Sequence, residues 1–345
     1  MSRAVLGIDI AKDTFAVALL HNSQCEQASF PNTPNGMQKL LTWLRKRKLT
    51  HVHACMEATG VYGEALALTL FEAGHTVSVV NPARIAAYAK SQLARNKTDA
   101  VDAQLIARFC LKEEPRAWTP PTPEVRDLRA LVRHLDDLLA MRQAEANRLQ
   151  AGSHPQAVQQ TLEDHLAFLA QQIDQLRQQI DAHIDSHPDL KRQCALLVSI
   201  KGIGRRTAAL LLAELGDISA FENARAVAAQ AGLTPRQFSS GSSVRKRTRL
   251  SKVGSARLRK ALYFPAIVAK RHNPIVRAFC ARLLAAGKSP MAVVGAAMRK
   301  LIHLVYGVLK TNTPFDPNYQ PVQAGGHHIN TITAADCPDR VLALA

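Results

Sequence analysis

The chain has 345 residues, enough for two or three domains, and 47% of them are hydrophobic, as in ordinary folded proteins. It has no run of about 18 uncharged apolar residues and no secretory signal at its start, so we expect neither a transmembrane helix nor export. Its six cysteines contain no CxxC pair, so we expect no zinc site or disulfide framework and place the chain in a reducing cytoplasm. The net charge of +17 and the pI near 10 indicate a polyanionic partner.

The positive charge is concentrated in one segment. Between Glu222 and Asp316 the chain has 18 Lys and Arg and no Asp or Glu, whereas the rest of the chain has 26 basic and 27 acidic residues. A solvated protein face normally mixes both signs. The segment therefore predicts a nucleic-acid partner whose binding weakens steeply with salt.

The N-terminal part predicts a mixed sheet covered by helices. Apolar alternation and turn residues indicate β-strands, and an amphipathic pattern indicates helices between the later strands. The expected strands are residues 4–11, 14–21, 26–31, 51–58 and 75–82, and the expected helices are residues 32–48, cap included, and 62–73. Three strands in succession followed by alternating helices and strands are typical of an α/β layout, which we assign to residues 1–118.

Four prolines at residues 115–123 mark a boundary, after which the pattern becomes helical. Leucine and other aliphatic residues recur every three or four positions from Val125 to Leu139 and again from Leu162 to Ile180, with GSHP between the two runs. This spacing predicts an antiparallel helical hairpin over residues 119–190. The pattern fits a helix pair packed within one subunit as well as it fits a dimerising coiled coil.

From residue 191 to 315 we expect a basic, mainly helical domain, and residues 316–345 read as a poorly ordered tail. Residues 196–217, which contain the motif SIKGIG, have the helix, GxG turn, helix form of a helix-hairpin-helix, in which backbone N–H groups approach a phosphate. Lys201, Arg205 and Arg206 flank this turn. Residues 237–254 combine serines with basic residues and contain no acid, which is typical either of a solvated basic loop or of a serine that attacks a phosphate held by arginines.

Four acidic residues occupy positions in the expected strands and helices where a negative charge calls for compensation or could bind a ligand. Asp9 lies within a strand that should be buried, where an unpaired charge is costly, although an edge strand would leave it in water. Glu57 ends the expected strand 51–58. Asp99 and Asp102 share one helical face, where their charges repel unless a cation or the helix dipole compensates. Carboxylate oxygens suit Mg²⁺, and two such ions can serve phosphoryl transfer.

These motifs, in this order, resemble a known family of transposases. GIDIAK, MEATG, KTDAVDAQLIA, SIKGIG, GLTPRQFSSG and LSKVGSARLRKALYFPA together resemble the DEDD-type insertion-sequence transposases of the IS one-ten (IS110) family, and within it the IS eleven-eleven (IS1111) branch. The likeness spans about residues 4–310. Such proteins are bridge-RNA-guided DNA recombinases.

The resemblance implies a RuvC-like (RNase H-like) N-terminal domain and a particular set of catalytic residues. Asp9, Glu57, Asp99 and Asp102 would bind Mg²⁺, two ions per site, and the coiled-coil hairpin would mediate oligomerisation. Ser240, the serine before glycine in the SG motif, would form a phosphoserine link to DNA. Ser239 stays open as an alternative nucleophile, and Ser242 and Ser243 read as loop or phosphate-contacting residues.

The expected partners are donor and target DNA, a noncoding bridge RNA, and further copies of the chain in a dimer or tetramer. We expect no membrane association and a location in the cytoplasm of a bacterium, associated with the nucleoid. The candidate phosphate contacts are all basic: Lys201, Arg205, Arg206, Arg236, Arg245, Lys246, Arg247, Arg249, Lys252, Arg257, Arg259 and Lys260. The chain has no histidine between residues 188 and 271, which excludes a sequence-local Ser–His pair. Activation of the serine must then come from elsewhere, and the acidic site is the candidate.

Two other functions remain compatible with the residues. A junction-resolving nuclease would use the acidic tetrad with water as the nucleophile and would not need Ser240. A non-catalytic nucleic-acid-binding protein would show salt-sensitive binding without Mg²⁺-dependent strand breakage, and its acids would be structural.

Overall fold

We describe a computed structural model, which covers residues 4–58, 60–92, 98–240 and 244–318. The chain divides into two compact units, Met1–Thr122 and Pro123–Ala345. The finer division of the second unit into a hairpin, a basic domain and a tail stays a prediction. Most of the tail, residues 319–345, lies outside the described residues.

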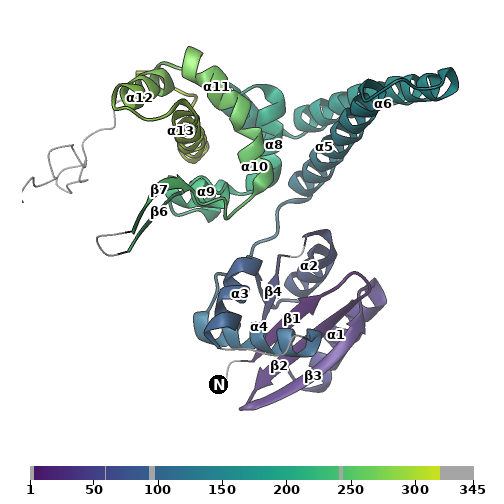
Figure 1. Cartoon of the computed structure of the whole chain (residues 1–345). Helices are drawn as coiled ribbons and strands as arrows, with labels where there is room; N and C mark the ends of the chain where they lie inside the picture. The colour runs from purple at the N-terminus through teal and green to yellow at the C-terminus, as the bar shows by residue number, and fades with distance from the viewer. Residues whose placement is uncertain (1–3, 59, 93–97, 241–243, 319–345) are drawn as a thin grey trace, which may run out of the picture. The chain divides into compact units, whose positions relative to one another are not determined.

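The first unit is built on a five-stranded mixed sheet with the order β3-β2-β1-β4-β5 (Figure 1). Its strands are β1 Val5–Ile10, β2 Thr14–His21, β3 Gln24–Pro31, β4 His53–Glu57 and β5 Thr76–Val80. The first three form an antiparallel meander, and β1, β4 and β5 are parallel. The predicted α/β layout is therefore confirmed, with β1 at the centre of the sheet.

Helices cover both faces of this sheet, as the alternation of buried residues along β1 requires. They are α1 Pro34–Lys46, the short 3₁₀ helix η1 Gly60–Gly63, α2 Glu64–Glu72, α3 Pro82–Ser91 and α4 Asp99–Glu113. Leu6 and Ile8 belong to the core shared with α1 and α2. Val5 belongs to the core on the opposite face, shared with α3 and α4.

A glycine in the central strand lets α4 approach the sheet closely. A Cβ atom on Gly7 would lie 2.1 Å from the carbonyl oxygen of Ala103 and 2.3 Å from the amide nitrogen of Ala107. Only a residue without a side chain fits between the strand and the helix at this point. Gly7 therefore determines which face of β1 packs against α4.

The second unit begins with two long helices, α5 Pro123–Gln150 and α6 Gln156–Ser186 (Figure 1). They run antiparallel, since the His183 ring is 2.8 Å from the carbonyl oxygen of Glu124 and the His165 ring is 3.3 Å from the Glu145 carboxylate. Leu128 and Val132 in α5, with Ile173 and Ile180 in α6, are among the buried residues that join them. The predicted helical hairpin is present; its role as a dimerising coiled coil stays a prediction.

The rest of the second unit is mainly helical, as predicted, and adds one β-hairpin. The elements are α7 Pro188–Val198, α8 Arg205–Leu215, the 3₁₀ turn η2 Ile218–Ala220, α9 Ala224–Gln230, β6 Pro235–Ser240, β7 Val244–Leu250, α10 Ala256–Ala261, α11 Tyr263–His272, α12 Pro274–Ala285 and α13 Pro290–Thr311. Residues 237–254, which could be either a solvated basic loop or the site of a reactive serine, are mostly an antiparallel pair of strands. These strands were not predicted, because a strand dominated by basic residues lacks the apolar alternation by which strands are recognised.

Helix α13 is long and apolar enough, by length and composition alone, to cross a membrane, and it is the one such helix in the described residues. It contains Arg299 and Lys300 and buries Val293, Leu301 and Val305 in the core of the second unit. A core helix passes the same test of length and composition, and packing accounts for the apolar character of α13.

Candidate functional site

Asp9 and Glu57 lie on adjacent parallel strands at the end of the sheet where both strands finish. Ile8 of β1 pairs with Met56 of β4, so the next step of the register places Asp9 beside Glu57. Paired residues of neighbouring strands share a face, and the strands are about 4.8 Å apart. Both side chains are half-buried. The structure therefore brings two predicted site carboxylates together on one face of the sheet.

Helix α4 carries the other two carboxylates toward the same end of the sheet. Near its C-terminal end the Cys110 thiol lies 3.9 Å from the carbonyl oxygen of His53, at the start of β4, and Ala103 contacts Gly7 further along. The helix thus runs opposite to β1 and β4 on the face that Gly7 and Asp9 share. Its first turn, with Asp99 and Asp102, is directed to the carboxyl ends of those strands.

The first turn of α4 is held in place by a side-chain cap. Thr98 has extended backbone angles, and its hydroxyl accepts a hydrogen bond from the Val101 amide at 3.3 Å. Asp99 is exposed and Asp102 is half-buried. Carboxylates in a first turn are also favoured by the positive end of the helix dipole, so the alternative explanation for this pair stays open.

The four carboxylates do not form a closed ligand cluster in this structure. Among the described residues, no three His, Cys, Asp or Glu side chains are gathered closely enough to hold a metal ion. The donor set is nevertheless of the right kind, since Mg²⁺ takes carboxylate oxygens and keeps several waters. The residues thus fit a magnesium site in chemistry and in their shared end of the sheet.

Cys55 and Cys110 form a buried pair of thiols near the carboxylates. The hydrogen bond with the Cys110 thiol, then burial, raises the pKa of the Cys55 thiol far above its ordinary value, and the Glu57 carboxylate acts in the same direction. The thiolate is the form that attacks or binds metal. Burial and the partner thiol thus disfavour the thiolate form of Cys55.

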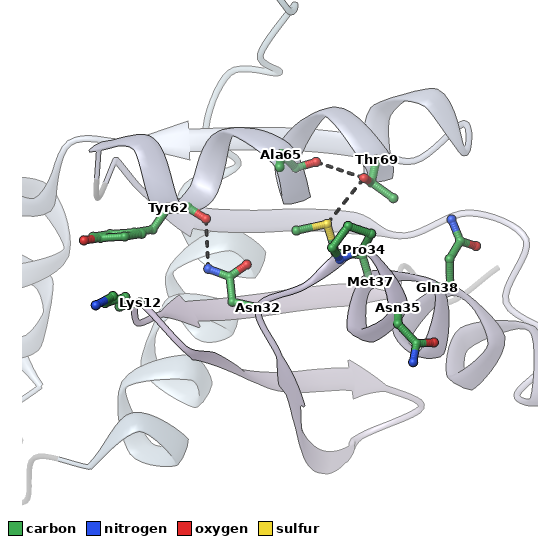
Figure 2. Close-up of a pocket in the computed structure, with 9 residues that line it drawn as sticks. All are labelled: Lys12, Asn32, Pro34, Asn35, Met37, Gln38, Tyr62, Ala65 and Thr69. Carbon is green, nitrogen blue, oxygen red and sulfur yellow. Dashed lines mark hydrogen bonds between the residues drawn. The ribbon is translucent and has the colours of Figure 1, made fainter.

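A cavity of about 570 Å³, lined by both polar and apolar side chains, opens at the same end of the sheet (Figure 2). It is lined by Lys12, Asn32, Pro34, Asn35, Met37, Gln38, Tyr62, Ala65 and Thr69. No function was predicted for these residues from the sequence. Lys12 follows Asp9 in the motif GIDIAK, which is the signal that could have suggested a functional neighbour.

The candidate nucleophile belongs to the second unit, at the tip of the β6–β7 hairpin. Ser240 is the last residue of β6 and pairs with Val244, and Ser239 pairs with Arg245. Gly241, Ser242 and Ser243 lie outside the described residues, as do the side chains of Phe238 to Ser240 and of Val244 to Arg247. The hairpin thus places both candidate serines beside the basic strand β7.

Two arginines face each other across this hairpin. Arg236 of β6 pairs with Arg249 of β7, and both side chains are exposed. Like charges directly opposite one another on a two-stranded sheet destabilise it. An anion between or above the two guanidinium groups would remove this cost, which is the behaviour expected of a phosphate-binding strand pair.

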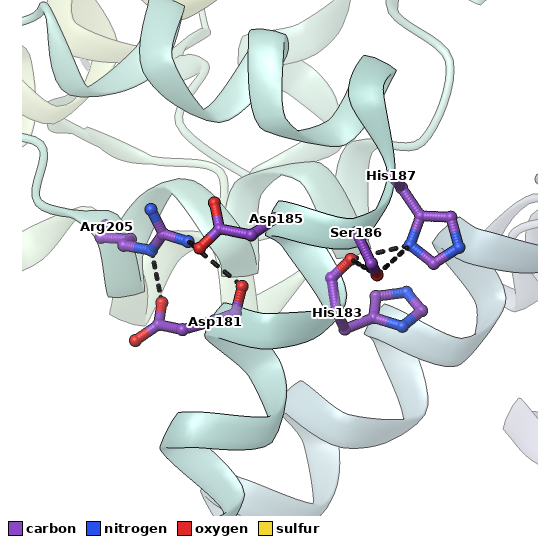
Figure 3. A network of polar contacts seen from close by, with 6 residues as sticks. All are labelled: Asp181, His183, Asp185, Ser186, His187 and Arg205. Carbon is purple, nitrogen blue, oxygen red and sulfur yellow. Dashed lines mark hydrogen bonds and ion pairs between the residues drawn. The ribbon is translucent and has the colours of Figure 1, made fainter.

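Three of the predicted phosphate contacts are engaged within the chain itself. Arg205 pairs with Asp181 at 2.5 Å and with Asp185 at 2.7 Å (Figure 3). These hydrogen bonds raise the pKa of the Arg205 guanidinium and lower the pKa of the Asp185 carboxyl. Arg257 pairs with Asp136 at 3.0 Å, and Arg259 donates to the carbonyl oxygens of Ala231 and Lys252.

The remaining described basic candidates are open to solvent. Lys201, Arg206, Lys252 and Lys260 have exposed side chains. Partial burial, followed by the nearby positive charges of Arg177 and Arg142, lowers the pKa of Arg206. A cation held close to other cations is stabilised by an anion, which agrees with its predicted place near a phosphate.

The GxG turn between α7 and α8 is present, and its first glycine is required for packing. Gly202 has φ +112°, and a Cβ atom there would lie 2.8 Å from the Ala269 Cβ and 2.9 Å from the Pro265 carbonyl oxygen. Gly204 caps α8 without any side-chain hydrogen bond, and a Cβ atom there would meet nothing within 4 Å. Gly202 is thus explained by its contact with α11, which sequence reasoning did not anticipate.

Comparison with known proteins places both units in one family. Residues 6–152 match a family described as "Transposase", and residues 194–281 match one described as "Transposase IS116/IS110/IS902 family". The chain is 36% identical over 319 residues to the "Pilin gene-inverting protein" of Moraxella bovis, which covers 92% of this chain and 98% of that relative.

Two further relatives are transposases of insertion elements. The chain is 26% identical over 294 residues to the transposase for insertion sequence element IS1328 of Yersinia enterocolitica, covering 75% of this chain and 81% of that relative. It is 26% identical over 302 residues to the transposase for insertion sequence element IS1111A of Coxiella burnetii, covering 78% of each. The family predicted from the motifs is confirmed: with its sheet-end carboxylates and its basic second unit, the chain belongs to the IS110 family of transposases.

Proposed function

We propose that this chain is a DNA recombinase that cuts and rejoins strands through a phosphoserine intermediate, with Asp9, Glu57, Asp99 and Asp102 as its Mg²⁺-binding residues. The observation that carries the proposal is the placement of Asp9 beside Glu57 at the carboxyl ends of two parallel strands, with the first turn of α4 directed to the same end. The order of the sheet, an antiparallel meander followed by two parallel strands, agrees with an RNase H-like fold for this unit.

The carboxylates would act by holding magnesium. When bound, Mg²⁺ supplies positive charge that stabilises both the attacking and the leaving oxygen of a phosphoryl transfer. Asp9 and Glu57 would act from rigid strand ends, whereas Asp99 and Asp102 would act from a capped helix turn. A cation would also relieve the repulsion among four carboxylates that share one end of a sheet.

In the covalent step, the Ser240 hydroxyl attacks the phosphorus of a DNA phosphodiester. A new bond forms between its oxygen and phosphorus, the bond to the leaving strand oxygen breaks, and the serine proton is lost as the leaving oxygen gains one. Attack by the hydroxyl of a second strand reverses the sequence and frees the serine. The number of phosphodiester bonds is conserved, so strands are exchanged without an external energy source.

The basic residues would hold the DNA backbone while this exchange takes place. Arg236 and Arg249 are exposed opposite each other on the hairpin that carries Ser240. A guanidinium can engage a phosphate through two parallel hydrogen bonds. Ser240 would be the nucleophile and Ser239, whose backbone pairs with Arg245, the alternative.

The remaining parts of the proposal concern partners. A noncoding bridge RNA would select donor and target DNA by base pairing, as in the IS1111 branch that the motifs resemble, and the chain would then read backbone and shape. The α5–α6 hairpin would join copies into a dimer or tetramer. The carboxylates and Ser240 belong to different compact units, which allows them to be donated by different subunits.

A covalent-trapping experiment tests the mechanism. The purified protein is incubated with Mg²⁺, labelled donor and target DNA and the noncoding RNA that flanks its element, then denatured, and any protein–DNA adduct is mapped by mass spectrometry. We expect a phosphoserine at residue 240 that disappears in Ser240→Ala and in Asp102→Ala. Asp13→Asn, which changes an exposed carboxylate in the turn after β1, should keep the adduct.

Each other result assigns a different function. An adduct at residue 239 would move the nucleophile by one position. Strand cleavage without an adduct, unchanged by Ser240→Ala, would indicate a nuclease that uses water. Salt-sensitive binding without any Mg²⁺-dependent strand breakage would leave a binding protein whose acids are structural.

A further inference from the structure

The cavity of Figure 2 is formed by segments that directly follow the candidate catalytic residues. Lys12 lies in the turn after β1, three residues beyond Asp9. Tyr62 lies in η1, five residues beyond Glu57. The third wall is the junction between β3 and α1, from Asn32 onward. The cavity therefore opens at the same end of the sheet as the carboxylates, on the side of the sheet that α1 and α2 cover.

The chemistry of the lining suits an anionic, hydrogen-bonding ligand. Among the described residues that line the cavity, Lys12 is the one charged residue and none is acidic. The amides of Asn35 and Gln38 and the phenol of Tyr62 supply both donors and acceptors. The volume of about 570 Å³ lies within the range of about 300–1,000 Å³ that small-molecule sites occupy.

One asparagine holds the three walls together. The Asn32 side-chain amide donates to the carbonyl oxygen of Ala11 at 3.1 Å and to the carbonyl oxygen of Tyr62 at 3.1 Å. Its backbone amide donates to the Asp13 carbonyl oxygen at 2.8 Å. Both side-chain N–H groups are thus used within the protein. Asn32 therefore preforms the cavity and ties the turn after Asp9 to the turn after Glu57.

Other lining side chains are left available to a ligand. Lys12, Asn35, Gln38 and Tyr62 are exposed, and no described group forms a hydrogen bond or ion pair with their side chains. Tyr62 has 45% of its surface exposed. Figure 2 shows Tyr62 and Lys12 at one end of the cavity and Asn35 and Gln38 at the other.

We propose that this cavity binds one nucleotide of a nucleic-acid strand that passes over the carboxyl ends of β1 and β4, since the cavity lies on the face of the sheet opposite to the one that Asp9 and Glu57 share. Tyr62 stacks on the base, Lys12 pairs with a phosphate, and Asn35 and Gln38 reach the base edge. An aromatic ring beside a cation is the arrangement by which proteins hold single strands, because every base offers a face for stacking. The proposal rests on the proposed function, since that function brings a strand to this end of the sheet.

The test is photo-crosslinking of the full-length protein, in two arms. One arm uses single-stranded DNA that carries 5-iododeoxyuridine, and the other uses RNA that carries 5-iodouridine, each mapped by mass spectrometry after irradiation. A crosslink on Tyr62 in the DNA arm identifies a DNA strand, and a crosslink in the RNA arm identifies RNA. Crosslinks confined to the second unit in both arms would overturn the proposal.

Variants give an independent readout through binding. We expect Tyr62→Ala to weaken the affinity for the crosslinked strand by roughly tenfold, and Tyr62→Phe to retain the affinity because the ring remains. Lys12→Gln should weaken binding and lower its salt dependence, whereas Lys39→Gln, an exposed lysine of α1 that does not line the cavity, should change neither. If Tyr62→Ala and Lys12→Gln bind the strand as tightly as the wild type does, the assignment is contradicted.

These measurements separate this proposal from the recombinase mechanism. Crosslinking and affinity need neither Mg²⁺ nor strand cleavage, so they remain readable if no phosphoserine forms. A protein that forms the adduct normally while Tyr62→Ala leaves binding and crosslinking unchanged would refute the cavity alone. Tryptophan fluorescence, which reports on the first unit through Trp43 and Trp118, confirms that each variant is folded.

Discussion

Gly7 in β1 and the Ala103 carbonyl oxygen in α4 pack so closely that a side chain at residue 7 would collide with that oxygen. A Cβ at Gly7 would lie 2.1 Å from that oxygen. The contact lies two residues before Asp9 on the strand and one residue after Asp102 on the helix. It therefore sets how closely the two carboxylates can approach.

The first prediction follows from this contact. Gly7→Ala should force α4 away from the sheet and lower the free energy of unfolding of the first unit by about 1–3 kcal/mol, the usual range for overpacking. Both tryptophans of the chain, Trp43 and Trp118, lie in this unit, so denaturation followed by their fluorescence isolates it. Gly152→Ala, in the second unit, where a Cβ would meet nothing within 4 Å, should leave the unfolding of the first unit unchanged. An unchanged free energy of unfolding in Gly7→Ala would show that the contact is not tight.

The second prediction concerns magnesium. If the four carboxylates bind Mg²⁺, the stability of the first unit should rise with the logarithm of the Mg²⁺ concentration, by about 2.7 kcal/mol at 100 times the dissociation constant. Asp102→Asn should remove most of this rise. Asp13→Asn should keep it, since that exposed side chain lies in the turn after β1. A rise that persists in Asp102→Asn, measured by the same fluorescence, would place the ion elsewhere.

A third prediction concerns Arg249, which faces Arg236 across the hairpin. Arg249→Gln should weaken DNA binding and reduce the slope of the logarithm of the affinity against the logarithm of the salt concentration by about 0.9, the value for one lost phosphate contact on duplex DNA. Arg192→Gln changes an exposed arginine that already pairs with Asp189 at 3.1 Å, and it should leave the slope unchanged. The measurement is a fluorescence-anisotropy titration at several salt concentrations; an unchanged slope in Arg249→Gln would remove the hairpin from the interface.

The fourth prediction is a pH dependence that originates at His75. Burial, followed by the nearby His51 and Arg45, lowers the pKa of His75 below its ordinary value of 6.5, and its Nδ1 is buried without a partner among the described atoms. In the pH range between the lowered pKa and 6.5 the unfolded chain binds more protons than the folded chain. Stability is therefore complete above pH 6.5 and falls as the pH decreases through this range.

His75→Gln should reduce the loss of stability of the first unit between about pH 7.5 and about pH 5.5, because the titrating group is gone. Tryptophan fluorescence during urea denaturation measures the loss at each pH. His154→Gln, in the second unit, should leave the pH dependence of the first unit as it is in the wild type. A dependence that is the same in His75→Gln and in the wild type would assign it to other groups.

The sequence was sufficient for the five strands of the first unit and for α1 and α2, because their patterns are local, whereas no residue range was predicted for α3. Leu6 and Ile8, for example, alternate with residues of the opposite face. These signals depend on neighbours within a few positions, so they survive without knowledge of the tertiary structure.

Contacts between distant residues could not be read in the same way. The β6–β7 hairpin has no apolar alternation to reveal it, and Arg257 finds Asp136 across 121 positions of the chain. No pattern in the sequence singles out Asn32, although its amide joins the two turns that follow Asp9 and Glu57. Such roles depend on which loops meet at one end of the sheet, and a single sequence does not state that.

The order of residues along the chain has a consequence for its synthesis. Asp136 of α5 and Asp181 and Asp185 of α6, the carboxylates that pair with Arg257 and Arg205, leave the ribosome before those arginines. N-terminal segments generally fold first during synthesis. The arginines that follow therefore emerge beside a helical hairpin whose carboxylates can pair with them. Without these carboxylates, the nearest polyanion would be the RNA of the ribosome itself.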